Sequence, residues 1–348
     1  MQNLTDYSLE EVQSLLSELN EPAYRAKQVY SWLSCCTPPS DMSNIPKSLR
    51  EKLATYPFGT VSIFEKRLSQ KDGTAKYLFS LTDGNLVEGV LMRYHYGNTQ
   101  CLSTQVGCRM GCKFCASTLE GCVRDLTPGE MLGQIAAVER DEPDPGVGKR
   151  NVTNLVLMGS GEPLDNYENV VKFLKLVSDP NGMGISPRNI SVSTCGLVPL
   201  IDRFMEEAPH VTLSVSLHAH DNATRSSIMP INNKYPIEDL LTAAKRYADC
   251  TGRRVIFEYA LIAEKNDTEA DAVALSKRLR GINCHVNLIP LNPVKERGLC
   301  GTTRERAAQF ASWLARERIS ATVRREMGTD IEGACGQLRR RVINEIRS

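Results

Sequence analysis

The sequence predicts an α/β protein, a partial (βα)6 barrel preceded by a small helical domain and a β-hairpin. From residue 101 onward, apolar or β-branched runs alternate with helix-like segments, as in a parallel sheet covered by helices. Before that point, helical spacing of apolar residues gives way to strands around a turn. The 348 residues can bury one large core and hold a smaller domain as well. We therefore expect an N-terminal accessory domain of helices and a β-hairpin, 1–95, and a barrel domain with a C-terminal catalytic loop, 96–348.

Three short helices should open the chain. Ser8-Leu-Glu-Glu11 is a capping box, and apolar residues follow it at helical spacing to about residue 20. A second helix is expected at 24–32, and a third at 46–56 because a proline suits the first turn of a helix. Five basic residues give this bundle a positively charged side: Arg25, Lys27, Lys47, Arg50 and Lys52.

Nine strand-like runs follow these helices in the sequence. They lie at 61–68, 76–81, 86–94, 101–106, 152–158, 190–194, 211–217, 255–262 and 284–290. The second and third are joined by Thr82-Asp-Gly-Asn85, which favours a hairpin turn. The last six are each followed by a helix-like segment, such as the one that opens at Thr127-Pro-Gly-Glu130 with an N-cap, an N1 proline and an N3 acid. These six units predict the parallel sheet of the barrel.

Glu88 is an unusual residue for the strand at 86–94. Period-two alternation places it on the same face as Leu86, Val90 and Met92. Two interpretations are open: an edge-strand charge that reaches solvent, or a buried carboxylate whose desolvation disfavours the charged form.

Three cysteines within eight residues give the strongest chemical signal. Cys108, Cys112 and Cys115 have the spacing Cys-x-x-x-Cys-x-x-Cys. Such a loop can hold three corners of a four-iron cluster and leave one iron open to another ligand, unlike ferredoxins, whose irons are all protein-bound. A structural zinc site, with Cys101 or Cys122 as its fourth ligand, is the alternative.

Other candidate residues follow the predicted strands. In a parallel barrel, functional groups gather at the carboxyl ends of the strands. Those ends carry the cysteine loop, Gly159-Ser-Gly-Glu-Pro163, Ser193-Thr-Cys-Gly196, Ser216-Leu-His218 and Pro290-Leu-Asn292. The glycines let the backbone approach a ligand closely, and Glu162 can accept hydrogen bonds from an ammonium group. His218 taken alone could equally be a structural histidine.

Composition limits the cellular setting. With 41% hydrophobic and 24% charged residues and no long apolar stretch, the chain should be a cytoplasmic protein that does not enter a membrane. Twelve cysteines then favour metal or redox chemistry over a disulfide scaffold. The net charge of +1 means that an RNA site would have to be a local patch. Four basic clusters could neutralise phosphates or be ordinary solvated surface: Lys149-Arg150, Arg253-Arg254, Arg324-Arg325 and Arg339-Arg-Arg341.

The cysteine motif, with an aromatic residue before Cys115, resembles the radical S-adenosylmethionine (SAM) signature. Further segments resemble the RlmN/Cfr family of RNA adenine methyltransferases: Gly161-Glu-Pro163, Ser214-Val-Ser-Leu-His218, Asn287-Leu-Ile-Pro-Leu-Asn292 and Ala334-Cys-Gly-Gln-Leu338. The resemblance covers nearly the whole chain and implies the partial (βα)6 fold, with an N-terminal domain, 1–95, that contacts RNA. It departs from the family pattern at Ser160, where the family usually has Met.

The resemblance also implies the site. Cys108, Cys112 and Cys115 would hold a [4Fe–4S] cluster whose open iron binds SAM, and two SAM molecules would be used per turnover. Seven residues would contact SAM: Gly161, Glu162, Ser193, Ser216, Leu217, His218 and Asn292. Cys335 would take a methyl group from one SAM, and a 5'-deoxyadenosyl radical from the other would activate it. Glu88 would act as general base, and Cys101 would release the product by forming a disulfide with Cys335.

Family members differ in product. RlmN-type members methylate C2 of an adenine in the peptidyl-transferase region of 23S rRNA and of the adenine beside the tRNA anticodon, whereas Cfr-type members methylate C8 of the rRNA adenine and confer antibiotic resistance. We favour RlmN because 287–293 and 189–194 resemble that branch. A monomer with an electron donor of flavodoxin or ferredoxin type is expected. A non-catalytic, zinc-stabilised RNA-binding protein and a radical SAM enzyme acting on a protein or small molecule stay open.

Overall fold

The computed structural model describes residues 2–143, 146, 149–291, 298–331, 338–339 and 341–342. One ten-stranded sheet runs through the protein in the order β1-β2-β3-β4-β7-β8-β9-β10-β11-β12, beside a two-stranded sheet of β5 and β6. In the ten-stranded sheet, β1, β2, β3 and β4 pair antiparallel. The strands that follow β4 in this sheet, from β7 to β12, are all parallel to their neighbours. The predicted α/β class and parallel barrel are confirmed, and the hairpin strands continue the sheet of the barrel.

The strands have the following bounds: β1 Ser62–Leu68, β2 Ala75–Ser80, β3 Leu86–Tyr94, β4 Gly97–Cys101, β5 Gln105–Gly107, β6 Cys122–Asp125, β7 Asn154–Leu157, β8 Ile190–Thr194, β9 Thr212–Ser216, β10 Val255–Leu261, β11 Cys284–Pro290 and β12 Ala321–Val323. Four of them, β4, β5, β6 and β12, differ from the sequence prediction. The first parallel strand ends at Cys101 instead of beginning there, and 105–107 belongs to the β5–β6 hairpin. The short β12 adds a parallel strand that the sequence did not predict.

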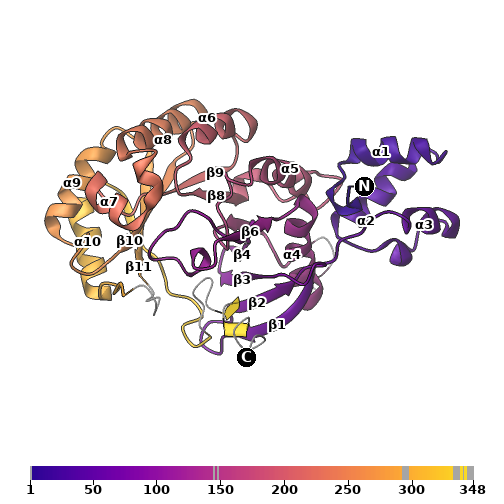
Figure 1. Ribbon diagram of the computed structural model, residues 1–348, viewed down its shortest axis with the longest axis horizontal. Helices are drawn as coiled ribbons and strands as arrows, with labels where there is room; N and C mark the ends of the chain where they lie inside the picture. The colour runs from indigo at the N-terminus through magenta and orange to yellow at the C-terminus, as the bar shows by residue number, and fades with distance from the viewer. Residues whose placement is uncertain are drawn as a thin grey trace.

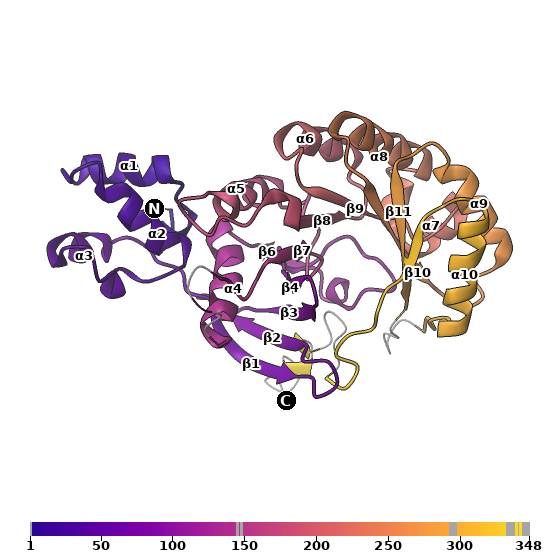
Figure 2. The ribbon, with the colours of Figure 1, turned by 180° about the vertical axis from the view of Figure 1, so that it is seen from behind.

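The main helices are α1 Leu9–Glu18, α2 Arg25–Ser34, α3 Lys47–Leu53, α4 Pro128–Asp141, α5 Tyr167–Ser178, α6 Val198–Glu207, α7 Asn222–Ile228, α8 Ile237–Thr251, α9 Glu269–Leu279 and α10 Arg304–Arg316. Helices α4 to α6 and α8 to α10 lie outside the curved sheet, and α1 to α3 form a group at the end opposite α9 and α10 (Figures 1 and 2). Helix α7 lies at the carboxyl ends of the strands, where its Ile228 carbonyl accepts from the backbone of Lys113. Within the described part of the chain, every helix is too short or too polar to span a lipid bilayer.

The N-terminal helices dock on the barrel through its first helix. The Asp6 carboxylate accepts a hydrogen bond from the Gly129 backbone at 2.6 Å, at the start of α4. A side chain at Gly129 would collide with Thr5, because an added Cβ would lie 2.1 Å from its hydroxyl oxygen. The expected basic side of the bundle is partly neutralised within the domain, since Arg25 and Lys52 both pair with Glu21.

The two faces of the parallel sheet differ in polarity. In β8 and β9, Ile190, Val192, Leu213 and Val215 point outward into the main hydrophobic core beneath the helices. The alternate residues, which include Ser191, Ser193, Ser214 and Ser216, face the barrel interior, and the hydroxyls of Ser191 and Ser214 lie 2.9 Å apart. Apolar packing therefore holds the helices outside and leaves a polar inner face for a site.

Candidate active site

The three motif cysteines lie in the loop between β5 and β6, at the carboxyl end of the barrel. Cys108 and Cys112 are buried and Cys115 is partly buried. The Cys108 backbone donates to the Gly121 carbonyl at 2.8 Å, which joins the two ends of the loop, and the Lys113 backbone near its middle donates to the Ile228 carbonyl of α7 at 2.9 Å. A small apolar cluster that includes Phe114, Met229 and Ile262 packs around it. The loop is thus held in place, with two of its three thiols buried.

The electrostatics of this loop show that the thiols are close neighbours. Burial raises the pKa of Cys108 to about 12, with a further contribution from charge on Cys115, and raises the pKa of Cys112 well above its usual range. A bound metal reverses this effect, because coordinating thiols are deprotonated. In the described part of the chain, no three His, Cys, Asp or Glu side chains are arranged to hold a single metal ion. The thiolates of a four-iron cube stand farther apart than those around one ion, and three sheltered thiols fit such a cluster.

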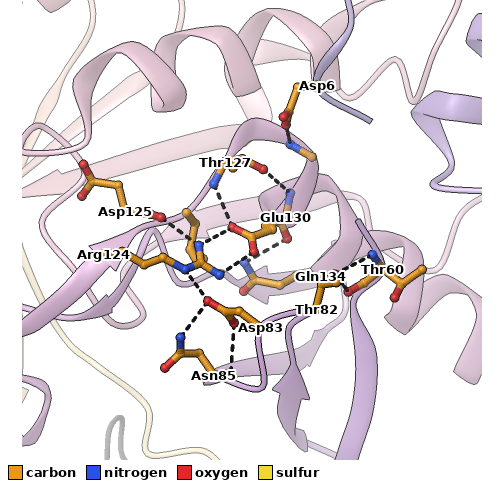
Figure 3. Close-up of polar contacts among 12 residues, drawn as sticks. Asp6, Thr60, Thr82, Asp83, Asn85, Arg124, Asp125, Thr127, Glu130 and Gln134 are labelled. Carbon is orange, nitrogen blue, oxygen red and sulfur yellow. Dashed lines mark hydrogen bonds and ion pairs between the residues drawn. The ribbon is translucent and has the colours of Figure 1, made fainter. Parts of the chain in front are cut away.

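Figure 3 shows the polar network that fixes the β5–β6 hairpin framing this loop. The Arg124 guanidinium on β6 donates to Asp83 in the β2–β3 turn at 2.6 Å and to both carboxylate oxygens of Glu130 on α4 at 2.7 and 2.8 Å. Glu130 also accepts from the Thr127 backbone at 3.0 Å, which completes the predicted capping box. The cap is visible in the sequence, whereas the role of Arg124 is not, because its partners come from two distant segments.

The loop after β7 packs directly against the chain that leads to the cysteines. Gly161 has φ +111°, and an added Cβ would lie 2.7 Å from the Gln105 backbone nitrogen, so the position requires glycine. Glu162 is buried and accepts hydrogen bonds from the backbones of Cys195 at 2.7 Å and Leu164 at 3.1 Å. Burial raises its pKa, while these donors oppose the shift. Glu162 therefore joins the second and third strand ends, and its oxygens keep lone pairs for a ligand ammonium.

Ser160, the departure from the family pattern, is also built into this contact. Its backbone donates to the Ser103 hydroxyl at 2.9 Å, and its carbonyl accepts from Thr104 at 2.8 Å. Its own hydroxyl donates to the Gly107 carbonyl at 3.3 Å, directly before the first motif cysteine. The shorter side chain thus adds a hydrogen bond between this turn and the cysteine loop.

His218 and its neighbours lie at the carboxyl end of β9, beside the cysteine loop. Burial and the nearby Arg225 lower the pKa of His218 to about 3, so the ring is neutral. Its Nδ1 accepts from the Ala260 backbone at 2.9 Å, which places the ring proton on Nε2. The Phe114 ring meets the imidazole edge-on, 4.8 Å between centroids. His218 is thus a satisfied structural group that also contacts the cysteine loop, whereas the buried Leu217 side chain belongs to the core.

Glu88 is buried on the inner face of β3, so the solvent-exposed interpretation is wrong. Its Oε2 lies 3.2 Å from the Nζ of Lys76, whose side chain is 0% exposed. Register places Leu78 of β2 opposite Glu88 and Cys101 of β4 opposite Val90. Cys101 is therefore a diagonal neighbour of Glu88 on one face. The role of Lys76 is not visible in the sequence, because its partner lies on the next strand.

The described residues of the C-terminal segment pack on the same face. Met327 packs with Val90, Met92 and Cys101, while Leu338 packs with Leu78 and Leu86 on the other side of Glu88. The Arg339 backbone donates to Glu88 Oε1 at 2.6 Å. The predicted residues Asn292 and Cys335 lie outside the described residues.

Comparison with known proteins gives concordant matches. The Radical SAM superfamily model matches residues 102–275, and the ribosomal RNA large subunit methyltransferase N-terminal domain model matches residues 2–57. The chain is 51% identical over 345 residues to a probable dual-specificity RNA methyltransferase RlmN of Clostridium botulinum (strain Eklund 17B / Type B), covering 99% of this chain and 98% of that protein. It is 48% identical over 348 residues to the equally named protein of Thermoanaerobacter sp. (strain X514), covering 99% and 100%.

A solved structure agrees with these relatives. The crystal structure of a radical SAM methyltransferase from Sphaerobacter thermophilus superposes with a TM-score of 0.91 at 43% sequence identity. The match covers 97% of this chain and 99% of that one. The fold is therefore shared from the N-terminal helices through the barrel.

Proposed function

Since the chain belongs to the RlmN family within the radical SAM superfamily, we propose that it methylates C2 of adenine 2503 in 23S rRNA and of adenine 37 in tRNA. The observation that carries this proposal is the near-complete match to relatives named as dual-specificity RNA methyltransferases. Membership in this family argues against a zinc-stabilised RNA-binding protein and against a radical SAM enzyme that acts on a protein or small molecule. The family uses a [4Fe–4S] cluster and two SAM molecules per turnover.

We assign the cluster to Cys108, Cys112 and Cys115. When bound, the cluster and SAM supply a carbon radical that can activate a methyl group, which an electrophilic ring carbon could not take up by a polar route. The apolar residues packed on the loop keep water away from that chemistry. Gly161, Glu162, Ser193, Ser216, Leu217, His218 and Asn292 are the proposed SAM contacts. Leu217 can take part only through its backbone, because its side chain is in the core.

Glu88 is the proposed general base. Its carboxylate must be anionic to accept the proton that leaves the methylated ring, and the Lys76 ammonium 3.2 Å away favours that anion. The Arg339 backbone N–H fixes Oε1, which leaves the carboxylate in one orientation.

Cys335 is the proposed methyl carrier and Cys101 the resolving thiol. Arg339, four residues beyond Cys335 in sequence, contacts Glu88, and Cys101 shares the face of Glu88. In the proposed last step the Cys101 thiolate attacks the sulfur of Cys335 and forms a disulfide, while the bond from that sulfur to the product carbon breaks. The electron pair of that bond goes to the product carbon, which takes up a proton from solvent and leaves as the methyl group of the RNA. A thiol reductant then resets both cysteines.

RNA approach is proposed at the carboxyl ends of the strands. Arg324 and Arg325 follow β12 at that end, and Arg339 and Arg341 lie beside the hairpin strands, where Arg341 pairs with Glu65. By contrast, Lys149-Arg150 and Arg253-Arg254 precede β7 and β10, at the amino ends of the strands. The target adenine must leave its stack to reach Glu88. We further propose a monomeric, cytoplasmic enzyme served by a donor of flavodoxin or ferredoxin type.

Two variants test the cysteine roles. Cys335→Ala should assemble the cluster and yet transfer no methyl group to RNA, whereas Cys101→Ala should accumulate a covalent protein–RNA adduct because the resolving thiol is missing. Denaturing gels with methyl-labelled SAM separate free RNA from adduct, and iron content reports the cluster. Release of methylated RNA at the wild-type rate from either variant would contradict these roles, and Cys250→Ala on the surface of α8 is the matched control.

A further inference from the structure

Arg225 is a fully buried arginine that no step above uses. It lies on α7, and its side chain ranks among the largest with less than 2% exposure. The guanidinium makes four hydrogen bonds: Nε donates to the Leu217 carbonyl at 3.1 Å, Nη1 to Asn232 Oδ1 at 3.1 Å, and Nη2 to the carbonyls of Cys195 at 2.7 Å and Ser216 at 3.0 Å. All four acceptors are neutral.

Its positive charge has no carboxylate partner within ion-pair distance among the described residues. The contrast is Lys76, equally buried, whose ammonium meets Glu88 at 3.2 Å. Removing an ion from water is unfavourable unless dipoles and an opposite charge replace the water. Here the dipoles of three carbonyl groups replace part of the lost hydration. Burial lowers the pKa of Arg225 only to about 10, so the guanidinium is charged at neutral pH. The opposite charge is expected from a bound group.

Arg225 lies beside the cysteine loop. The Lys113 backbone of that loop donates to the carbonyl of Ile228, three residues after Arg225 on the same helix. Cys195, whose carbonyl binds Nη2, packs against the motif residue Cys112.

We propose that Arg225 is the buried counter-charge of the [4Fe–4S] cluster and raises its reduction potential. This inference rests on the proposed function, because it requires a cluster on the three cysteines. An oxidised cluster with three thiolates carries one net negative charge, and the electron delivered by an external one-electron donor adds a second. A fixed positive charge in a low-dielectric site stabilises the doubly charged state more than the singly charged state.

Arg225 also positions two strand ends, so the test must separate charge from geometry. Arg225→Gln removes the charge and keeps an amide that can donate. Asn232→Asp keeps the arginine and brings a carboxylate to the atom that already accepts from Nη1. Arg225→Lys keeps the charge but loses the planar donor set. Arg246→Gln, on the outer face of α8 where the side chain pairs with Asp202, is the matched control.

The experiment is an anaerobic redox titration of the reconstituted full-length protein without SAM, followed by the EPR signal of the reduced cluster. Iron and sulfide analysis accompanies each variant. We expect the midpoint potential to move to more negative values in Arg225→Gln and Asn232→Asp, to stay near wild type in Arg225→Lys and to be unchanged in Arg246→Gln. A loosened loop that admits water would move the potential the other way, because water also stabilises the more negative cluster.

A fully loaded cluster at the wild-type potential in both charge-neutralising variants would overturn the proposal. If Arg225→Gln does not fold or hold iron, Asn232→Asp decides alone. A wild-type protein that binds no EPR-active cluster would instead contradict the proposed function, which keeps the two failures distinct.

Discussion

Lys76 and Glu88 form a buried ion pair at the centre of the proposed active site. Neither side chain is more than 4% exposed, and the neighbouring residues Val90 and Met92 are apolar. Such a pair contributes little net stability compared with two well-packed apolar residues. Its presence beside Cys101 is explained if the carboxylate is needed as an anion during turnover.

Lys76→Met should leave Glu88 buried without its counter-charge. Breaking a buried pair destabilises a protein by about 3–5 kcal/mol, and loss of a general base lowers a rate by about 10²- to 10⁴-fold. Thermal unfolding and single-turnover methylation measure the two effects. The double variant Lys76→Met with Glu88→Gln should regain much of the stability and stay inactive; a double variant with wild-type activity would exclude Glu88 as the base.

The site residues that could be predicted are those recognisable from their immediate neighbours in the sequence. Cys108, Cys112 and Cys115 are recognised by spacing alone. Lys76 and Arg225 were missed because a buried cation looks like a surface cation until its partners on other segments are known. For Glu88, alternation revealed the unusual position, but only the strand order shows that β3 is an inner strand between β2 and β4.

The C-terminal segment is held by the turn between β1 and β2. The Gly328 backbone donates to Asp72 at 2.9 Å, and Asp330 accepts from the Ser69 hydroxyl at 2.6 Å and from the Gln70 backbone at 2.9 Å. Desolvation opposes ionisation of Asp72, but the N–H groups of Gly328 and Thr74 outweigh it and lower its pKa to about 2. This clamp, residues 69–74 with 327–331, fixes the chain just before the segment that carries Cys335.

Asp72→Ala combined with Asp330→Ala should loosen the clamp without touching the cysteine loop. Because small misplacements of reacting groups are costly, we expect RNA methylation to fall by between about tenfold and a hundredfold while cluster content stays the same. Limited proteolysis should cut the variant faster near residues 327–331. Asp202→Ala, on the surface of α6, is the control; equal methylation by the clamp variant and the control would show that the clamp does not position the carrier segment.

Element boundaries were predictable where hydrophobic runs are long. The strands β8 to β11 and the capped helix α4 follow from their sequences. The three-residue β12 was not predictable, because Ala321–Val323 is too short to show a period and pairs only through β11. The β5–β6 hairpin was also missed, since it is held by the Arg124 network and not by an alternating pattern (Figure 3).

In the whole molecule, the direction of the parallel strands places the basic clusters at two opposite ends of the barrel. Arg325 and Arg254 are both exposed arginines beside parallel strands, but Arg325 follows β12 whereas Arg254 precedes β10. Arg325→Ala should weaken RNA binding and reduce by about one the slope of log affinity against log salt, as expected for a lost phosphate contact. Arg254→Ala should leave both unchanged. Filter binding across a salt series measures this, and the reverse ranking would move the RNA to the other end of the barrel.

The fold class was predictable because six βα units and a capped helical start leave few arrangements. The position of the C-terminal segment over β2 and β3 was not, because 338–342 and 76–88 are distant in sequence and meet through Leu338 and Leu86. That Glu88, Cys101 and described residues of this segment lie close together is therefore visible only in the folded molecule.

The most direct test of the account is nucleoside mass spectrometry of 23S rRNA and tRNA after anaerobic reaction of the reconstituted protein with SAM and a reductant. The RNAs should come from a strain that lacks this modification. We expect new 2-methyladenosine at adenine 2503 of the rRNA and adenine 37 of the tRNA. Finding 8-methyladenosine in the rRNA alone would contradict the assignment to the RlmN reaction, and finding no methylated adenine despite SAM cleavage would contradict RNA as the substrate.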